Sequence, residues 1–298
     1  MSRWLEWTLQ ALARRPLRHL HALGAAVGWL AYGASPSYRA RLRANAQLAG
    51  VARADWRASV AEAGRMTLEL PRLWLRPPTQ PIADPVSWTG AEHIEAGLAA
   101  GRGIVLLTPH MGSFEVAAQA YAERYGARQP ITVLYRPARQ AWLRELEETA
   151  RARPALATAP ATLTGVRQMM RALKRGETLG LLPDQVPPEG MGVWVPFFGQ
   201  PAYTMTLGAR LALQTGAVPL LIWGERLPRG AGYVVHVTPL SAALPAAQAG
   251  GDLSAAAAAM NRNMELMILA KPSQYLWGYH RYKEPRQVEA SSEKAAGV

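Results

Sequence analysis

Apolar residues recur at helical spacing near the start of the chain. They follow one another three or four positions apart, the spacing that places side chains on one face of a helix. These positions are Leu20, Leu23, Val27 and Leu30. Pro16 interrupts the pattern, because proline cannot continue a helix from its interior. We therefore predict two helices over residues 3–45, broken near Pro16, and a further helix over residues 53–75.

Short apolar runs separated by helical patterns follow further along the chain. Such runs are typical of strands that are buried on both faces of a parallel sheet. We predict strands at residues 104–108, 131–135, 179–182, 218–223 and 233–237, and helices at residues 113–125, from 141, 164–175, 205–215 and 253–270. The alternation indicates an α/β fold with a mixed, mainly parallel sheet flanked by helices. We expect one catalytic domain over residues 46–283 and a disordered polar tail over 284–298.

Cations and tryptophans border the apolar face of the first helices. The arginines are Arg3, Arg14, Arg15, Arg18, Arg39, Arg41 and Arg43, and the tryptophans are Trp4, Trp7 and Trp29. The apolar run over residues 22–34 is shorter than the roughly 20 residues that span a bilayer. We therefore expect residues 1–45 to lie on a membrane surface as a monotopic anchor. The alternative is an ordinary amphipathic helix pair packed on the core with a solvated basic face.

Charge and composition narrow the classes of partner and chemistry. The 298 residues carry a formal net charge of +12, which indicates an anionic partner such as an acidic protein, a nucleic acid or a phosphate-bearing membrane. The chain has no cysteine, which excludes disulfides, thiolate metal sites and a cysteine nucleophile. The histidine spacing suggests no metal site, and we expect no cofactor. No secretory pattern precedes Pro36, so the protein is expected on the cytoplasmic side of its membrane.

A histidine and an acid stand at the first strand-to-helix turn. On one continuous helix, His110 and Glu115 would lie about 140° apart and could not cooperate. Here His110 precedes the helix, and Ser113 is a plausible N-cap that places Glu115 in the first turn. A carboxylate on one imidazole nitrogen leaves the other free to accept a proton from an alcohol. We therefore predict His110 as general base and Glu115 as its orienting acid.

The segment around this pair, Thr108 to Glu115, resembles the HX4D/E block of the glycerolipid acyltransferase superfamily. It resembles most closely the late lauroyl/myristoyl acyltransferases of lipid A biosynthesis, which have glutamate at the acid position. The resemblance extends in family order over most of the chain, through residues 41–45, 134–137, 171–177, 183–185, 195–199, 215–219 and 274–283. It implies acylation of a lipid A precursor at the inner leaflet of the inner membrane.

Further residues are candidates for substrate binding. The Arg136 guanidinium could bind a phosphate through two parallel hydrogen bonds. The alternative is that Arg136 forms a structural salt bridge. Asp184 and Gln185 follow an apolar strand, where open α/β sheets place ligand sites. In an acyl transfer, the helix N-terminus near Ser113, or Arg136, would stabilise the negatively charged oxygen that develops on the acyl carbonyl. The resemblance suggests an arginine pair at Arg151 and Arg153, although the proline-rich stretch 154–160 that follows departs from the family and leaves acceptor recognition open.

These observations predict direct acyl transfer from a thioester to a hydroxyl, without an acyl-enzyme. An acidic acyl carrier protein as donor would account for the basic surface, with acyl-CoA as the other donor. We assign the positive charge to this partner and to an anionic membrane, not to nucleic acid. Three alternatives stay open: another lipid or glycolipid acceptor, a non-catalytic basic binder of membrane or nucleic acid, and a thioesterase.

Overall fold

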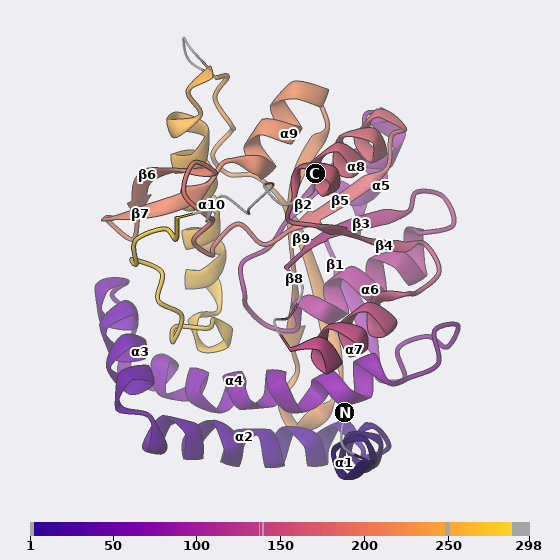
Figure 1. Ribbon diagram of the computed structural model, residues 1–298, viewed down its shortest axis with the longest axis vertical. Coiled ribbons are helices and arrows are strands. Elements are labelled where there is room, and N and C mark those ends of the chain that lie inside the picture. Colours follow the sequence, from indigo (N-terminus) through magenta and orange to yellow (C-terminus); the bar gives the residue numbers. More distant parts are fainter. Residues whose placement is uncertain (1–2, 137, 139, 248–250, 288–298) are drawn as a thin grey trace, which may run out of the picture.

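The computed structural model describes residues 3–136, 138, 140–247 and 251–287 (Figure 1). Its helices are α1 (Arg3–Ala13), α2 (Leu17–Ala34), α3 (Pro36–Leu48), α4 (Arg53–Trp74), α5 (Ala91–Ala100), α6 (Phe114–Tyr125), α7 (Ala141–Arg151), α8 (Leu163–Lys174), α9 (Leu207–Thr215), α10 (Ser254–Ala270), η1 (Pro228–Gly230) and η3 (Pro272–Gln274). Its strands are β1 (Val86–Thr89), β2 (Ile104–Leu107), β3 (Ile131–Tyr135), β4 (Leu156–Pro160), β5 (Thr178–Leu181), β6 (Gly192–Phe197), β7 (Gln200–Met205), β8 (Val218–Arg226) and β9 (Tyr233–Pro239). Most of the tail expected to be disordered, residues 288–298, lies outside the described part.

Seven strands form one sheet in the order β1-β9-β8-β2-β5-β3-β4. Strands β8, β2, β5, β3 and β4 run parallel to one another, while β9 is antiparallel to β8 and parallel to β1. The mixed, mainly parallel sheet predicted from the alternation of elements is therefore confirmed. Strands β6 and β7 form a separate antiparallel hairpin beside α10.

The central strand β2 separates two layers of the core. Ile104 and Leu106 lie in the cluster that includes residues of α5 and α6, whereas Val105 and Leu107 lie in the cluster shared with α8, α9 and α10. All four side chains are buried. The uninterrupted apolar run at this position thus reflects burial on both faces, since successive side chains of a strand point to opposite sides.

The N-terminal region contains three helices, not the two that we predicted. The break near Pro16 is confirmed, but a second break separates α2 from α3 at Ser35 and Pro36. Pro36 occupies the first turn of α3, where its missing N–H costs nothing, and the Ser35 hydroxyl accepts a hydrogen bond from the N–H of Tyr38 at 3.3 Å. The boundary proposed at residue 45 stays a prediction.

Helices α2 and α4 lie side by side along one edge of the molecule (Figure 1). They approach closely because glycines meet at their interface. A Cβ atom on Gly64 would lie only 1.9 Å from the carbonyl oxygen of Gly24, and one on Gly28 would lie 2.2 Å from that of Val60. In the described part of the chain, no helix is long and apolar enough to cross a membrane.

Several elements were missed by the sequence patterns. Strand β1, helix α5, strand β4 and the β6–β7 hairpin all fall in segments for which we predicted no helix or strand. The proline-rich stretch 154–160, for which we predicted no strand, contains β4 at the edge of the sheet. An edge strand tolerates proline, because one side of its backbone needs no partner. The helix predicted from residue 205 begins at Leu207, since Met205 ends β7.

Candidate active site

Two neighbouring parallel strands deliver the central pair of side chains to the same edge of the sheet. Strand β2 ends at Leu107 and β5 ends at Leu181, and these two residues are register partners. His110 and Asp184 each follow three residues later. Equal offsets from paired strand ends bring the two side chains together, at the carboxyl edge where α/β sheets bind ligands.

Asp184 holds both the ring and the main chain of His110. Its Oδ1 lies 2.6 Å from His110 Nδ1, and its Oδ2 accepts the His110 backbone N–H at 2.9 Å. Burial alone raises the pKa of Asp184, but the hydrogen bonds and electrostatic interaction with His110 outweigh it and lower this pKa. Asp184 is therefore an ionised acceptor, and His110 carries its proton on Nδ1. The free nitrogen, Nε2, lies 3.0 Å from the amide nitrogen of Gln185, which donates to it.

Glu115 does not make the contact with His110 that the sequence predicted. Ser113 does occupy the N-cap position and Glu115 the first turn of α6, as expected, although the Ser113 side chain makes no capping hydrogen bond. The Glu115 carboxylate is instead paired with Arg151 at the end of α7. Asp184 takes the place on the imidazole, because β5 brings it to the ring while the first turn of α6 directs Glu115 toward α7.

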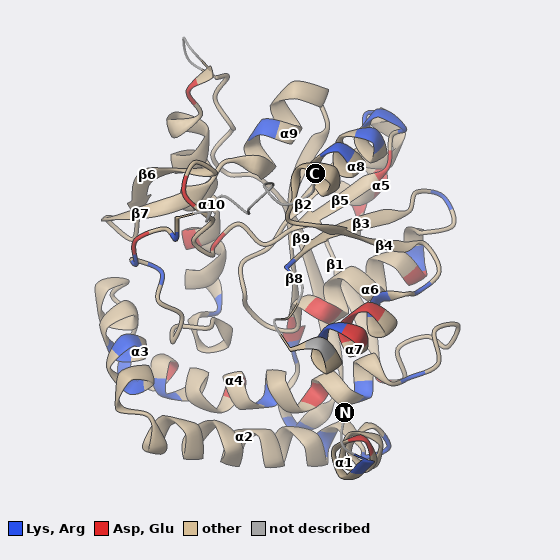
Figure 2. Cartoon of the chain, viewed as in Figure 1, with Lys and Arg blue, Asp and Glu red and all other residues tan. Residues whose placement is uncertain are grey.

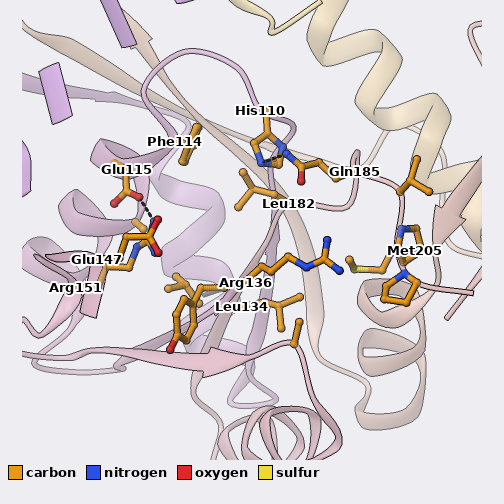
Figure 3. Close-up of a pocket in the computed structure, with 17 residues that line it drawn as sticks. His110, Phe114, Glu115, Leu134, Arg136, Glu147, Arg151, Leu182, Gln185 and Met205 are labelled. Atoms are coloured by element: carbon orange, nitrogen blue, oxygen red, sulfur yellow. Dashed lines mark hydrogen bonds and ion pairs between the residues drawn. The ribbon is translucent and has the colours of Figure 1, made fainter. Parts of the chain in front are cut away.

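A pocket of about 320 Å³ lies in front of His110 (Figure 3). His110, Glu115, Arg136, Arg151 and Gln185 all line it. The Arg136 side chain projects into this space from the end of β3, and among the described residues it has no ion-pair partner. Arg136, predicted to bind a phosphate, and His110, predicted to be the base, thus line the same cavity.

A second pocket, of about 420 Å³, reaches His110 from the side of the helix pair. Its walls come mainly from α2, α4 and the segment after η3, and they are largely apolar. They include Val27, Ala31, Ala63, Met66 and Leu276, and His110, Asp184 and Gln185 also line the pocket. His110 therefore lines both pockets, and the second has the more apolar walls.

The two arginines suggested by family resemblance have different surroundings. Arg151 lines the first pocket, and although burial alone lowers its pKa, the Glu115 charge raises it overall. Arg153 instead donates to main-chain carbonyls at the end of α4, including that of Leu73 at 2.7 Å. Ser113 is also buried, and its N–H donates to the Gly224 carbonyl at 2.7 Å, which leaves that N–H unavailable to an oxyanion.

Sequence reasoning missed two residues of the site. The Tyr275 hydroxyl donates to Asp184 Oδ2 at 3.3 Å, and burial raises the pKa of Tyr275 well above its usual range, so the donor stays protonated. Glu147 lines the first pocket and accepts the N–H of Ala138 at 3.2 Å. Tyr275 lay within a segment of family resemblance, whereas a lone glutamate in an acidic helix carried no signal.

The chain was compared with known protein families and curated proteins. The family described as bacterial lipid A biosynthesis acyltransferase matches residues 2–284. The lipid A biosynthesis lauroyltransferase of Escherichia coli is 30% identical over 200 residues, 66% of this chain and 62% of that protein. The palmitoleoyltransferase of the same organism is 29% identical over 206 residues, 68% of this chain and 63% of that protein.

The name of a third relative gives a different lipid class as its substrate. The phosphatidylinositol mannoside acyltransferase of Mycobacterium tuberculosis is 27% identical over 194 residues, 62% of this chain and 56% of that protein. The matches span less than two thirds of the length of these relatives. The family match over nearly the whole chain confirms the resemblance inferred from the motifs, and the chain belongs to the bacterial lipid A biosynthesis acyltransferase family.

Proposed function

We propose that this protein is an O-acyltransferase that moves a fatty acyl chain from a thioester to a hydroxyl of a lipid acceptor. One observation carries the proposal most directly: His110 lines a pocket, and a buried carboxylate fixes its Nδ1. A neutral imidazole held in this tautomer can accept a proton from an alcohol. The arrangement matches the orienting half of a catalytic triad, with the substrate hydroxyl in place of a serine.

In the proposed step, His110 Nε2 takes the hydroxyl proton while the oxygen attacks the thioester carbonyl. The C–O bond forms, the C–S bond breaks, and the thiolate leaves with the proton returned by the imidazolium. The Gln185 amide is hydrogen-bonded to Nε2, so the hydroxyl has to displace it. The displaced amide and Arg136 are the candidate donors to the oxyanion. No covalent acyl-enzyme is needed, and His110 serves as base and then as acid.

We propose that Glu115 serves the reaction through Arg151. The carboxylate neutralises this arginine and fixes its position on the wall of the first pocket. Arg136 is then left as the cation that meets a phosphate of the donor or the acceptor, because a planar guanidinium suits bidentate phosphate binding. The apolar second pocket is suited to a hydrocarbon chain, whose burial is favoured by about 0.8 kcal/mol per methylene.

We propose that the outer faces of α1 and α2 lie on an anionic membrane surface. Residues 19–38 contain no Lys, Arg, Asp or Glu, and α2 is correspondingly almost uncoloured in Figure 2. Trp4, Trp7 and Leu30 are strongly exposed on these helices, and arginines stand on either side of the uncharged stretch. Apolar side chains flanked by arginines are typical of interfacial helices. The corresponding place in the cell is the cytoplasmic face of the inner membrane.

Family membership supports a lipid A precursor as acceptor, and the names of the Escherichia coli relatives point to the same pathway. The net charge of +12 supports an acidic acyl carrier protein as donor, since opposite charges accelerate encounter. Acyl-CoA stays the alternative donor. The mycobacterial relative keeps a different glycolipid acceptor open.

Mass spectrometry of reaction products tests the proposal. The wild type and His110→Ala are incubated with acyl-carrier-protein thioester and either a tetra-acylated, Kdo-bearing lipid A precursor or a phosphatidylinositol mannoside. A gain of one acyl chain on one acceptor with the wild type alone is the expected result. Free fatty acid without acylated product would favour a thioesterase. Equal product from His110→Ala would overturn the general-base assignment.

A further inference from the structure

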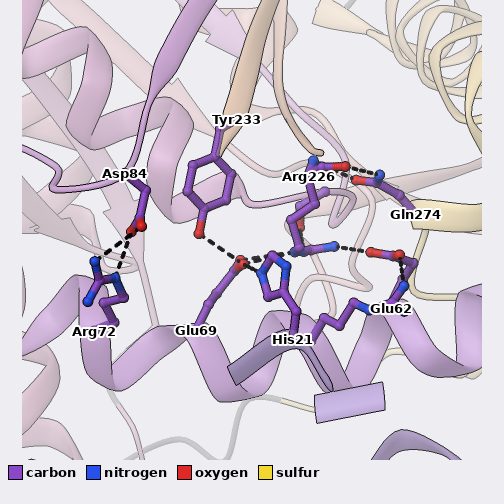
Figure 4. Close-up of polar contacts among 10 residues, drawn as sticks. His21, Glu62, Glu69, Arg72, Asp84, Arg226, Tyr233 and Gln274 are labelled. Carbon is purple, nitrogen blue, oxygen red and sulfur yellow. Dashed lines mark hydrogen bonds and ion pairs between the residues drawn. The ribbon is translucent and has the colours of Figure 1, made fainter. Parts of the chain in front are cut away.

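A buried cluster of charges (Figure 4) contacts the turn between β2 and α6, the turn that contains His110. At its centre is Arg226, at the end of β8, with a side chain only 2% exposed. Its Nε lies 3.1 and 3.0 Å from the two carboxylate oxygens of Glu69, and its Nη1 lies 2.9 Å from Glu62 Oε2. Its Nη2 donates to the main-chain carbonyl of Gly112. One guanidinium therefore joins helix α4 to the turn between β2 and α6.

Other groups complete the cluster around the Glu69 carboxylate. The Tyr233 hydroxyl donates to Glu69 Oε2 at 3.1 Å, and His21 Nε2 lies 3.1 Å from the same oxygen. Burial alone raises the pKa of Glu69, but Arg226 and His21 outweigh it and lower this pKa. The ionised pair is thus retained inside the protein, where an unpaired charge would cost several kcal/mol. Through His21, the cluster also reaches α2.

The turn itself has little freedom where Arg226 holds it. Gly112 has φ +53°, and a Cβ there would lie 2.0 Å from the Gly224 carbonyl oxygen. Its N–H donates to the main-chain carbonyl of Gln274 at 2.9 Å, and the Gln274 amide in turn bonds both main-chain groups of Arg226, at 3.0 and 2.9 Å. Only Met111 stands between Gly112 and His110. A displacement of the Gly112 carbonyl is therefore passed directly to His110.

We propose that Arg226 is a positioning residue for His110, held in place by Glu62 and Glu69 of α4. Two observations together carry this: the direct bond to the catalytic turn and the placement of both counterions on α4. The inference rests on the proposed role of His110 as base. Because α4 packs along α2, whose outer face is the proposed membrane surface, Arg226 also links that helix pair to the site. A purely structural ion pair would stabilise the fold without affecting turnover by the folded enzyme.

The decisive variant is Arg226→Lys. Lysine keeps the positive charge near Glu69, but its single ammonium cannot also reproduce the fork that reaches Glu62 and Gly112. We expect kcat to fall about 100-fold, the effect of a displacement of about 1 Å at a catalytic group, with KM changed less than about twofold. The matched control is Arg72→Lys, because Arg72 also binds a carboxylate with two nitrogens, at 2.7 and 3.1 Å from Asp84, but does not touch the turn. It should keep wild-type kcat.

A spectroscopic measurement separates positioning from stability. The proton between His110 Nδ1 and Asp184 should give a downfield 1H NMR signal, identified by its loss in His110→Ala. We expect Arg226→Lys to shift or broaden that signal and Arg72→Lys to leave it unchanged. Glu62→Gln is the second variant in case Arg226→Lys does not fold, since Glu62 is partly exposed and Glu69 still balances the charge. Glu62→Gln should also lower kcat, as Arg226→Lys does.

The outcomes distinguish this inference from the proposed function. Wild-type kcat and an unchanged downfield signal in folded Arg226→Lys or Glu62→Gln, with His110→Ala inactive, would overturn the positioning role alone. Full activity of His110→Ala would overturn both. A lower kcat with unchanged KM and an altered His110 signal, against an unaffected Arg72→Lys, would establish Arg226 as a positioning residue.

Discussion

Asp184 forms two hydrogen bonds with His110, one with the ring nitrogen Nδ1 at 2.6 Å and one with the main-chain N–H at 2.9 Å. This double contact fixes the position of the residue and the tautomer of its ring. Asp184→Asn would keep the size of the side chain but remove the negative acceptor. We expect kcat to fall about 10²-fold to 10⁴-fold, the usual contribution of a well-placed general base. Activity within twofold of wild type in the folded variant would exclude the orienting role of Asp184.

The pairing of Glu115 with Arg151 leads to a prediction about additivity. If Glu115 acts through Arg151, then Glu115→Gln and Arg151→Gln should each reduce activity, and the double variant should be no worse than the poorer single variant. A coupling of about 0.5–3 kcal/mol is typical of residues in direct contact. The measurement is a double-mutant cycle in kcat/KM. Simple addition of the two effects would favour an independent role for Glu115, as the sequence first suggested.

Arg136 projects into the first pocket without an ion-pair partner in the described part of the chain. Arg136→Ala should raise the KM of the phosphate-bearing substrate about tenfold or more, because hydrogen bonds to charged groups contribute about 1.5–3 kcal/mol. Steady-state kinetics with donor and acceptor varied in turn would show which substrate is affected. Arg175→Ala is the control, since Arg175 is exposed and paired with Glu177 outside the pocket. An unchanged KM for both substrates would rule out phosphate binding by Arg136.

The exposed face of α2 predicts a site-specific effect on membrane binding. Leu30→Ser should weaken partitioning onto vesicles containing anionic lipid about tenfold, because a buried leucine contributes about 1.5–3 kcal/mol. Leu163→Ser is the matched control, since Leu163 on α8 is 73% exposed and Leu30 is 72% exposed. Co-sedimentation with vesicles measures both. Equal losses for the two variants would mean that α2 is not the membrane-facing element.

Two buried carboxylates predict how stability responds to acid. The pKa values of Asp184 and Glu69 are both lowered from their ordinary values of 3.8 and 4.5. Such groups stabilise the fold above the ordinary value, and their contribution is lost as pH falls through the lower folded-state pKa. Denaturant unfolding should therefore give a free energy that decreases below about pH 5. Asp184→Asn should flatten part of this dependence, and a curve as steep as that of the wild type would contradict the assignment.

Local patterns in the sequence were sufficient for the central features of the fold. The apolar run of β2, with its two buried faces, identified the strand before His110, and the Ser113 position identified the start of α6. These features depend on residues that are close to one another in the sequence, so the spacing of residue types is enough to predict them. The proline-rich β4 escaped prediction because an edge strand lacks the residue preferences of a central one.

Tertiary structure decided which residues contact the turn that contains His110. Asp184 is 74 residues from His110, and only the pairing of β5 with β2 places it on the imidazole in preference to the nearby Glu115. Arg226 is 114 residues from Gly112 and reaches it because β8 lies on the other side of β2. The order of strands in a sheet depends on which buried surfaces fit together across the whole chain. The spacing of residues within one segment therefore cannot predict which strands become neighbours.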